Sequence, residues 1–285
     1  MRVRDVANVA GGVLCLVLCA CSDTAHGSTK VAGKDSSAVL TATRSTAGAG
    51  IAVDTANRTL ATATAGSYQA GTASAASGTL RVQISSVKPL PVDTLVKPDP
   101  DSTRCNPFID ATFPLHRGAV NSVGNAVAWL VGVNHGPRDE SPRRVNIRIE
   151  KCQLLPRVQR VPVGATIIAN NRDKSPSDLR FALAGKSTAQ TTLHFTESGQ
   201  VVPSTEALAK PGLVEVRDAR HPWLRSYIAV APHPFVAVTD VDGKFSWDGV
   251  PQGNYQLVVW HERMGARVVP VAMKAGQTLD VHVEY

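Results

Sequence analysis

The sequence predicts an all-β protein in which two β-sandwiches follow a disordered N-terminal tether. From Leu80 to the C-terminus, short runs rich in Val and Ile are separated by Pro, Gly and Asp turns. Several runs, such as residues 144–149, alternate polar and apolar side chains as half-buried strands do. Residues 21–77 consist mainly of Ala, Thr, Ser and Gly, and they have too little apolar surface to offset the entropy of ordering.

The expected strands are short and evenly spaced, which is typical of sandwiches. No amphipathic helix of ten or more residues is predicted, and residues 203–210 are expected to hold one short turn. In chain order, the expected strands are 80–84, 126–133, 144–149, 165–169, 213–216, 227–230, 235–238, 255–260, 268–273 and 279–285.

The N-terminus predicts secretion and lipid anchoring. Two arginines precede the apolar run 13–18, which is too short to span a bilayer and is typical of a signal peptide over residues 1–20. The following Leu-Cys-Ala-Cys resembles a bacterial lipobox, which implies acylation of Cys21. Ser22, by analogy with Gram-negative sorting, favours the outer membrane facing the periplasm, where several acyl chains hold firmly. Cleavage as a plain secretory signal is the alternative.

Cysteine usage agrees with an oxidising compartment. Cys15, Cys19 and Cys21 belong to the signal, which leaves Cys105 and Cys152 in the mature chain. An even pair in a secreted protein predicts a disulfide. This bond would close a loop of about 47 residues and stabilise the fold by ~4 kcal/mol. Two separate buried thiols are the alternative.

Residues 144–231 resemble a cupredoxin domain. The resemblance lies in residues 145–149, 161–164 and 167–173, and in His221-Pro222-Trp223-Leu224, which is similar to the His-Pro-Trp-Met end of a periplasmic, plastocyanin-type subgroup. It implies a Greek-key sandwich and places the four copper-ligand positions at Ser177, Asp218, His221 and Leu224.

These residues do not suit blue copper. Asp218 stands at the thiolate position and Leu224 at the methionine position, so there is no soft donor for Cu(I). One His and one Asp are also fewer than the three or four ligands of an ordinary metal site. We therefore expect a degenerate copper site, with no metal and no cofactor.

A second resemblance covers the C-terminal part. Residues 239–245 and 250–255 look like a carboxypeptidase-regulatory-like, transthyretin-type sandwich. Asp242-Gly243 is expected to turn a hairpin, with Phe245 and Tyr255 packed inward. Residues 78–143 would supply the first strands and 232–285 the remainder, with the cupredoxin-like part inserted between them. A serial arrangement of the two domains is the alternative.

The familiar catalytic motifs are absent from the sequence. There is no Gly-x-Ser-x-Gly elbow, and His261-Glu262 is not followed by a second His at the zinc-protease spacing. His233, His261 and Glu262 are a hypothetical polar or divalent-metal cluster at the domain junction. The alternative is that they are separate structural residues.

The formal net charge of +7 and the pI of about 9.3 favour contact with anionic surfaces. Nucleic acid is excluded as a partner because no arginine-rich helix or aromatic-studded basic strip occurs. A basic group of residues either faces water or docks an anionic envelope polymer or protein. It comprises Arg138, Arg143, Arg144, Arg148, Lys151, Arg157 and Arg160.

The sequence therefore favours a non-catalytic, lipid-anchored binding or interaction module. Two other classes are kept as alternatives. One is a copper-binding or electron-transfer protein with an atypical site, and the other is an accessory, carbohydrate-binding module of polysaccharide metabolism. The sequence makes no prediction of oligomeric state.

Overall fold

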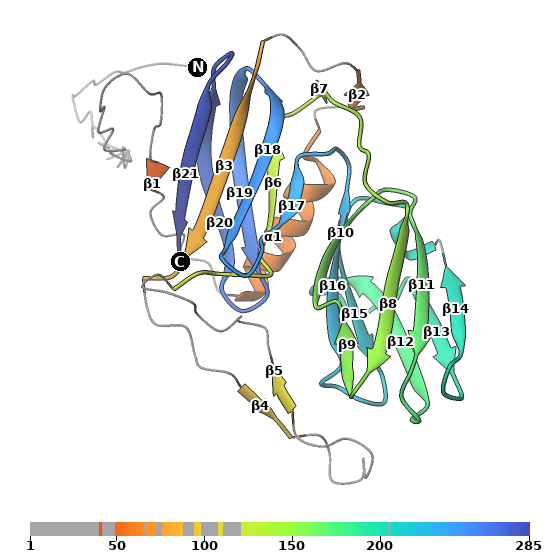
Figure 1. The fold of residues 1–285 in the computed structure, drawn as a ribbon. Helices are drawn as coiled ribbons and strands as arrows, with labels where there is room; N and C mark the ends of the chain where they lie inside the picture. Colours follow the sequence, from red (N-terminus) through yellow and green to blue (C-terminus); the bar gives the residue numbers. More distant parts are fainter. Residues whose placement is uncertain are drawn as a thin grey trace, which may run out of the picture.

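The computed structural model describes residues 40–41, 49–64, 67–71, 76–87, 94–97, 108–110, 121–204 and 206–285. They form two β-sandwiches with one α-helix between them (Figure 1). The predicted all-β sandwich fold is confirmed. The predictions for residues 1–20, Cys21 and Cys105 concern positions outside the described residues.

The first sandwich is built from the two ends of the folded chain. Its core includes Leu80, Ile84, Leu130 and Leu257, all 0% exposed. One sheet has the order β1 (Leu40–Thr41), β21 (Thr278–Glu284), β3 (Ser77–Ser85) and β18 (Lys244–Pro251). The other has the order β17 (Val236–Val238), β6 (Val127–Val131), β19 (Gly253–His261) and β20 (Gly265–Met273).

The second sandwich is continuous in sequence, and its core includes Ile147, Ile167, Phe181 and Phe195. One sheet has the order β10 (Val158–Pro162), β16 (Arg225–Ala231), β15 (Gly212–Asp218), β12 (Ser177–Leu183) and β13 (Thr191–Phe195). The other has the order β14 (Val201–Ser204), β11 (Thr166–Asn171), β8 (Arg144–Glu150) and β9 (Gln153–Leu155).

Smaller elements complete the described part. They are the pairs β2 (Gln69–Ala70) with β7 (His135–Gly136) and β4 (Thr94–Val96) with β5 (Phe108–Asp110), and the single 3-10 turn η1 (Glu206–Leu208). The turn η1 falls inside the segment 203–210, where one short turn was expected.

The second sandwich interrupts the first. Strand β3 pairs with β18 and β21, and β6 pairs with β17 and β19, so strands on both sides of the insertion share sheets. Strands that precede the second sandwich in the chain thus share sheets with strands that follow it, which differs from a serial arrangement. The chain consequently crosses between the sandwiches twice, near residues 137–143 and 232–235 (Figure 1).

One local prediction for this sandwich is wrong. The Asp242-Gly243 turn does not close a two-stranded hairpin, because β17 and β18 lie in different sheets. Instead the Asp240 carboxylate accepts hydrogen bonds from the amides of Asp242 and Lys244 at 2.9 and 2.8 Å. Gly243 has φ 73°, and an added Cβ would lie 2.3 Å from the carbonyl oxygen of Ile84, so only glycine fits this turn.

Helix α1 (Ala49–Ala61) corrects the prediction of a tether over residues 21–77 and of no long helix. Ala56, Leu60 and Ala63 follow one another at helical spacing and are 0% exposed. The small side chains that indicated disorder allow the helix to approach two sheets closely. In the described part of the chain, no helix is long and apolar enough to cross a membrane.

A third apolar cluster joins α1 to both sandwiches. Leu60 packs in it with Trp129 and Trp260 of the first sandwich and with Leu213 and Tyr227 of the second. The rings of Tyr227 and Trp260 meet edge to face, with centroids 5.1 Å apart. Burying this much aromatic surface fixes the two sandwiches against each other.

A buried amide also fastens α1 to the second sandwich. Asn57 Nδ2 donates to the carbonyl of Ala184 at 2.7 Å, and its Oδ1 accepts from the amide of Leu213 at 2.8 Å.

We expect Asn57→Ala to lower the free energy of unfolding by about 2 kcal/mol, since it leaves two buried backbone groups without partners. Urea unfolding measures this loss. The exposed Arg58→Ala change is the matched control, and an equal effect from both would contradict the clamp.

Candidate functional site

The four predicted ligand positions meet at one end of the second sandwich. Ser177 begins β12, Asp218 ends β15, and His221 and Leu224 lie in the loop between β15 and β16. The Asp218 amide donates to the Leu224 carbonyl at 3.2 Å, and the Leu224 amide donates to the His221 carbonyl at 2.9 Å. The loop is therefore a tight, hydrogen-bonded turn that returns the chain to the sheet.

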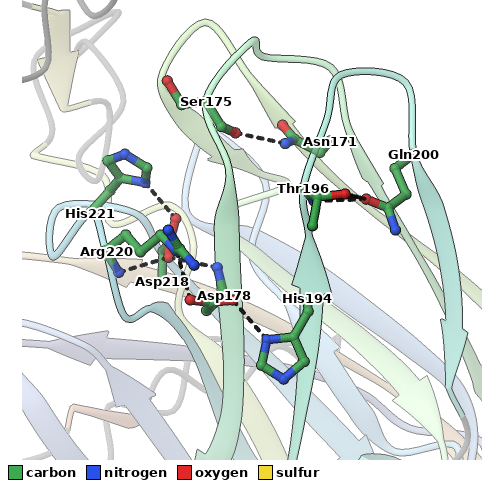
Figure 2. A network of polar contacts seen from close by, with 9 residues as sticks. All are labelled: Asn171, Ser175, Asp178, His194, Thr196, Gln200, Asp218, Arg220 and His221. Carbon is green, nitrogen blue, oxygen red and sulfur yellow. Dashed lines mark hydrogen bonds and ion pairs between the residues drawn. The ribbon is translucent and has the colours of Figure 1, made fainter.

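Asp218 is the centre of this end of the sandwich (Figure 2). Its side chain is 0% exposed, and its Oδ2 accepts from His221 Nδ1 at 2.7 Å. Its Oδ1 accepts from the amides of Asp178 and Arg220 at 3.0 and 2.9 Å. Burial raises the pKa of Asp218, but the hydrogen bonds from His221 and from the two amides outweigh it, and the pKa is lowered.

A second carboxylate lies beside the first but nearer to water. Asp178 accepts from His194 Nδ1 and from Arg220 Nε, both at 2.7 Å (Figure 2). The His194 bond first, and then the Arg220 bond, lower the pKa of Asp178. Both carboxylates are thus ionised and engaged with groups of this chain. These hydrogen bonds and ion pairs link β12, β13 and the loop between β15 and β16.

The space at the site is too small for a substrate. Ser177, His221, Trp223 and Leu224 help to line a cavity of about 10 Å³, roughly what one water occupies. The imidazole of His221 bonds to Asp218 through Nδ1, and the buried Ser177 hydroxyl has no hydrogen-bond partner among the described residues. A nucleophilic triad also needs a hydrogen bond between the imidazole and the serine, so Ser177 is not activated here.

The residues of the site do not suit a metal ion either. Among the described residues, no three His, Cys, Asp or Glu side chains gather closely enough to hold one. Asp218, at the predicted thiolate position, offers a hard oxygen donor that does not suit Cu(I), and both of its oxygens already accept hydrogen bonds.

In the part of the chain that the structure describes, His233, His261 and Glu262 do not gather into a group that could hold a metal ion. His233 Nε2 donates to the Leu130 carbonyl at 3.0 Å. Glu262 instead binds Arg157 through both oxygens at 2.8 and 2.7 Å. His261 is 0% exposed, and its Nδ1 accepts from a neighbouring amide at 3.3 Å. Each residue therefore serves its own part of the domain junction.

Cys152 is disulfide-bonded and 7% exposed. The other four cysteines of the chain lie outside the described residues, so the pairing with Cys105 stays a prediction. The backbone beside Cys152 is held by Asp173, whose carboxylate accepts from the amides of Lys151 and Cys152 at 2.8 and 2.7 Å.

Some members of the predicted basic group form ion pairs within the protein, and the others are exposed. Three of its seven members bind carboxylates: Arg148 with Glu150, Arg157 with Glu262, and Arg160 with Asp139. The other four, Arg138, Arg143, Arg144 and Lys151, are exposed. The cationic surface is therefore smaller than the sequence indicated.

Sequence reasoning missed Asp178, His194 and Asp139. Asp178 and His194 are partners only because β12 and β13 pair in the register that sets them opposite each other. Only the register of the β12–β13 hairpin indicates that Asp178 and His194 are neighbours.

Comparison with known proteins adds little at the level of the whole chain. No protein-family model matches the sequence, and no curated protein matches it. Among solved structures, a methionine-to-alanine mutant of amicyanin in the Cu(I) form aligns at 20% identity, with 32% of this chain and 84% of that chain covered and a TM-score of 0.26. A purple cupredoxin from Nitrosopumilus maritimus aligns at 18% identity over 30% of this chain and 99% of that chain, with a TM-score of 0.27. Amicyanin from Paracoccus versutus aligns at 20% identity over 32% and 85%, with a TM-score of 0.27. We draw no functional conclusion from likenesses of this size.

The burial of His233 gives a pH-dependent contribution to stability. His233 is 1% exposed, and burial, followed by the nearby Arg160 charge, lowers its pKa from 6.5 to about 4, although Leu130 and Asp139 act in the opposite direction. The unfolded chain therefore binds a proton that the folded chain rejects as the pH falls from 6.5 to 4. Stability is fully present above this window and is lost through it, by about 3 kcal/mol for this group.

We expect His233→Gln to flatten the dependence of Tm on pH between 4 and 6.5, because the unfolded chain then gains no proton at this position. Thermal unfolding across this range measures the effect. The exposed His135→Gln change is the control. A wild-type slope in His233→Gln would show that another group carries the acid sensitivity.

Proposed function

We propose that this protein is a non-catalytic binding module of the bacterial cell envelope, anchored to the outer membrane by an acylated Cys21 and facing the periplasm. One observation carries the non-catalytic part. The Asp218 carboxylate accepts hydrogen bonds from His221 and two amides inside a cavity of about 10 Å³. Its lone pairs are engaged in holding the loop rather than directed at a ligand.

The proposal also assigns each of the two sandwiches to a family. Residues 144–231 form a cupredoxin-like sandwich with a degenerate copper site, and the interrupted sandwich is carboxypeptidase-regulatory-like. The meeting of Ser177, Asp218, His221 and Leu224 at one end of a two-sheet sandwich supports the first assignment. The pairing of β3 and β6 with strands after the insertion supports the second.

The proposed partner is an anionic polymer of the envelope. The net charge of +7 and the exposed Arg138, Arg143, Arg144 and Lys151 favour such a partner. A copper-binding or electron-transfer role is the second candidate, since His221 remains at the loop. An accessory role in polysaccharide metabolism would use the same anionic partner. In that role the protein would assist an enzyme that acts on the polymer.

An absorption spectrum with metal analysis separates binding from electron transfer. We expect the full chain, purified in detergent and incubated with Cu(II), to have no intense thiolate-to-copper band, because Asp218 stands at the sulfur position. The positive control is the triple change Ser177→His, Asp218→Cys and Leu224→Met, which supplies a thiolate, two imidazoles and a thioether. A coloured, tightly bound copper centre in the unmodified chain would refute the proposal.

Binding to a polyanion tests the partner class. We expect the full chain to bind immobilised alginate, a polyuronate, at low salt and to lose at least about tenfold in affinity between roughly 20 and 150 mM salt, as screened surface charges do. Neutral dextran is the matched control. Binding of equal strength to both polymers, or binding that salt does not change, would contradict an electrostatic partner.

A further inference from the structure

A pocket of about 470 Å³ opens where the chain crosses between the sandwiches. One wall comes from the outgoing crossover, with Arg138, Glu140 and Arg143. The opposite wall comes from the returning crossover, with His233 between two prolines, and Tyr68 adds a ring from the segment before β2. The volume is that of a small-molecule site. The pocket is distinct from the closed cavity at Asp218.

A buried arginine holds the two walls in place. Arg160 of β10 is 11% exposed at its side chain and binds the Asp139 carboxylate, with Nη1 2.8 Å from Oδ1. Its Nη2 also donates to the backbone carbonyl of His233 at 3.1 Å. Burial raises the pKa of Asp139, but Arg160 and Ser141 outweigh it and the pKa is lowered. Both crossovers are therefore tied to one strand, and the pocket is formed before any ligand arrives.

Two guanidinium groups at the pocket remain available for a ligand. Arg138 and Arg143 are both exposed, and over the described residues neither is paired with a carboxylate. Guanidinium groups bind carboxylate or phosphate through two parallel hydrogen bonds. Glu140, also exposed, offers acceptor oxygens close by, and these suit hydroxyl donors.

Apart from Asp139, whose carboxylate is paired with Arg160, the remaining lining is uncharged. The Tyr68 hydroxyl donates to the Pro137 carbonyl at 2.8 Å, so the hydroxyl is already engaged and the ring is held in one position. Gly136 makes room for it, because an added Cβ would lie 2.6 Å from the Tyr68 hydroxyl oxygen. The His233 ring lies 5.9 Å from the Tyr68 ring and is neutral near pH 7. Such a surface packs against the C–H face of a ring.

We propose that this pocket binds one acidic saccharide unit, a sugar ring that carries a carboxylate or a phosphate. Arg138 and Arg143 hold the anionic group, Glu140 accepts hydroxyl hydrogens, and the Tyr68 ring packs on the sugar. The identity of the sugar rests on the proposed function, since an anionic polymer of the envelope would present such units. The ligand bridges both crossovers, so its binding also stiffens the junction between the sandwiches.

Calorimetric titration of the full chain with trigalacturonate and with glucose 6-phosphate tests the site. We expect binding of at least one probe, and a loss of about tenfold or more when Arg138→Gln and Arg143→Gln are combined, because each guanidinium contributes charge-assisted hydrogen bonds. The carboxylate and phosphate probes distinguish the two sources of negative charge. Tyr68→Ala should weaken both probes without changing which of them is preferred.

The pair Arg180→Gln and Lys274→Gln is the matched control, since it removes the same charge from exposed positions that do not line the pocket and belong to no proposed surface. Equal losses from both pairs would overturn the site in favour of general electrostatics, and no binding of either probe would overturn it outright. If the Arg138 and Arg143 pair leaves alginate binding unchanged, the pocket fails while the proposed function stands. If the probes bind but alginate does not, the pocket stands and the polymer partner fails.

Discussion

The contact between the two sandwiches is the constraint on which the rest of the structure depends. Strand β6 sends Ala128 and Leu130 into the first core and Val127 and Trp129 into the shared cluster. Its sheet is therefore buried on both faces, and leaving one face in water would expose large aromatic side chains. Helix α1 fills the remaining gap with small residues, while Leu60 reaches both partners. The order of the domains in the chain matters less than this shared apolar layer.

The same layer explains where polar groups are placed. Glu215 is 4% exposed at the junction, and it receives Arg217 Nε at 2.6 Å, Arg225 Nε at 3.2 Å and the Tyr227 hydroxyl at 3.1 Å. A buried carboxylate without such partners would be costly. Asp218, at the far end of the second sandwich, is also a buried carboxylate whose oxygens have hydrogen-bond partners. Its partners are two backbone amides and one imidazole, and together they hold the loop between β15 and β16.

The insertion also creates a place that neither sandwich would have alone. Two crossovers must run side by side because the chain leaves the first sandwich and returns to it. Arg160 binds Asp139 on one crossover and the His233 carbonyl on the other, which sets their separation. Charged side chains beyond that clamp project into the space that remains. A polar pocket at the junction is thus a geometric consequence of the topology, and its ligand is decided by the side chains that line it.

The sequence by itself determined the fold class, and it predicted an interrupted first sandwich and four positions that would meet around Asp218. The fold class follows from local alternation, which each strand carries within its own residues, whereas the interruption and the four positions are what the resemblances to known families implied. The sequence did not predict helix α1, because Ala and Thr give its buried face little apolar character. The helix is stabilised by packing against two sheets that are distant in the chain. Only the tertiary structure decided which carboxylate each cation meets, because strand register and the crossing of two connections bring together groups that sequence spacing leaves unrelated.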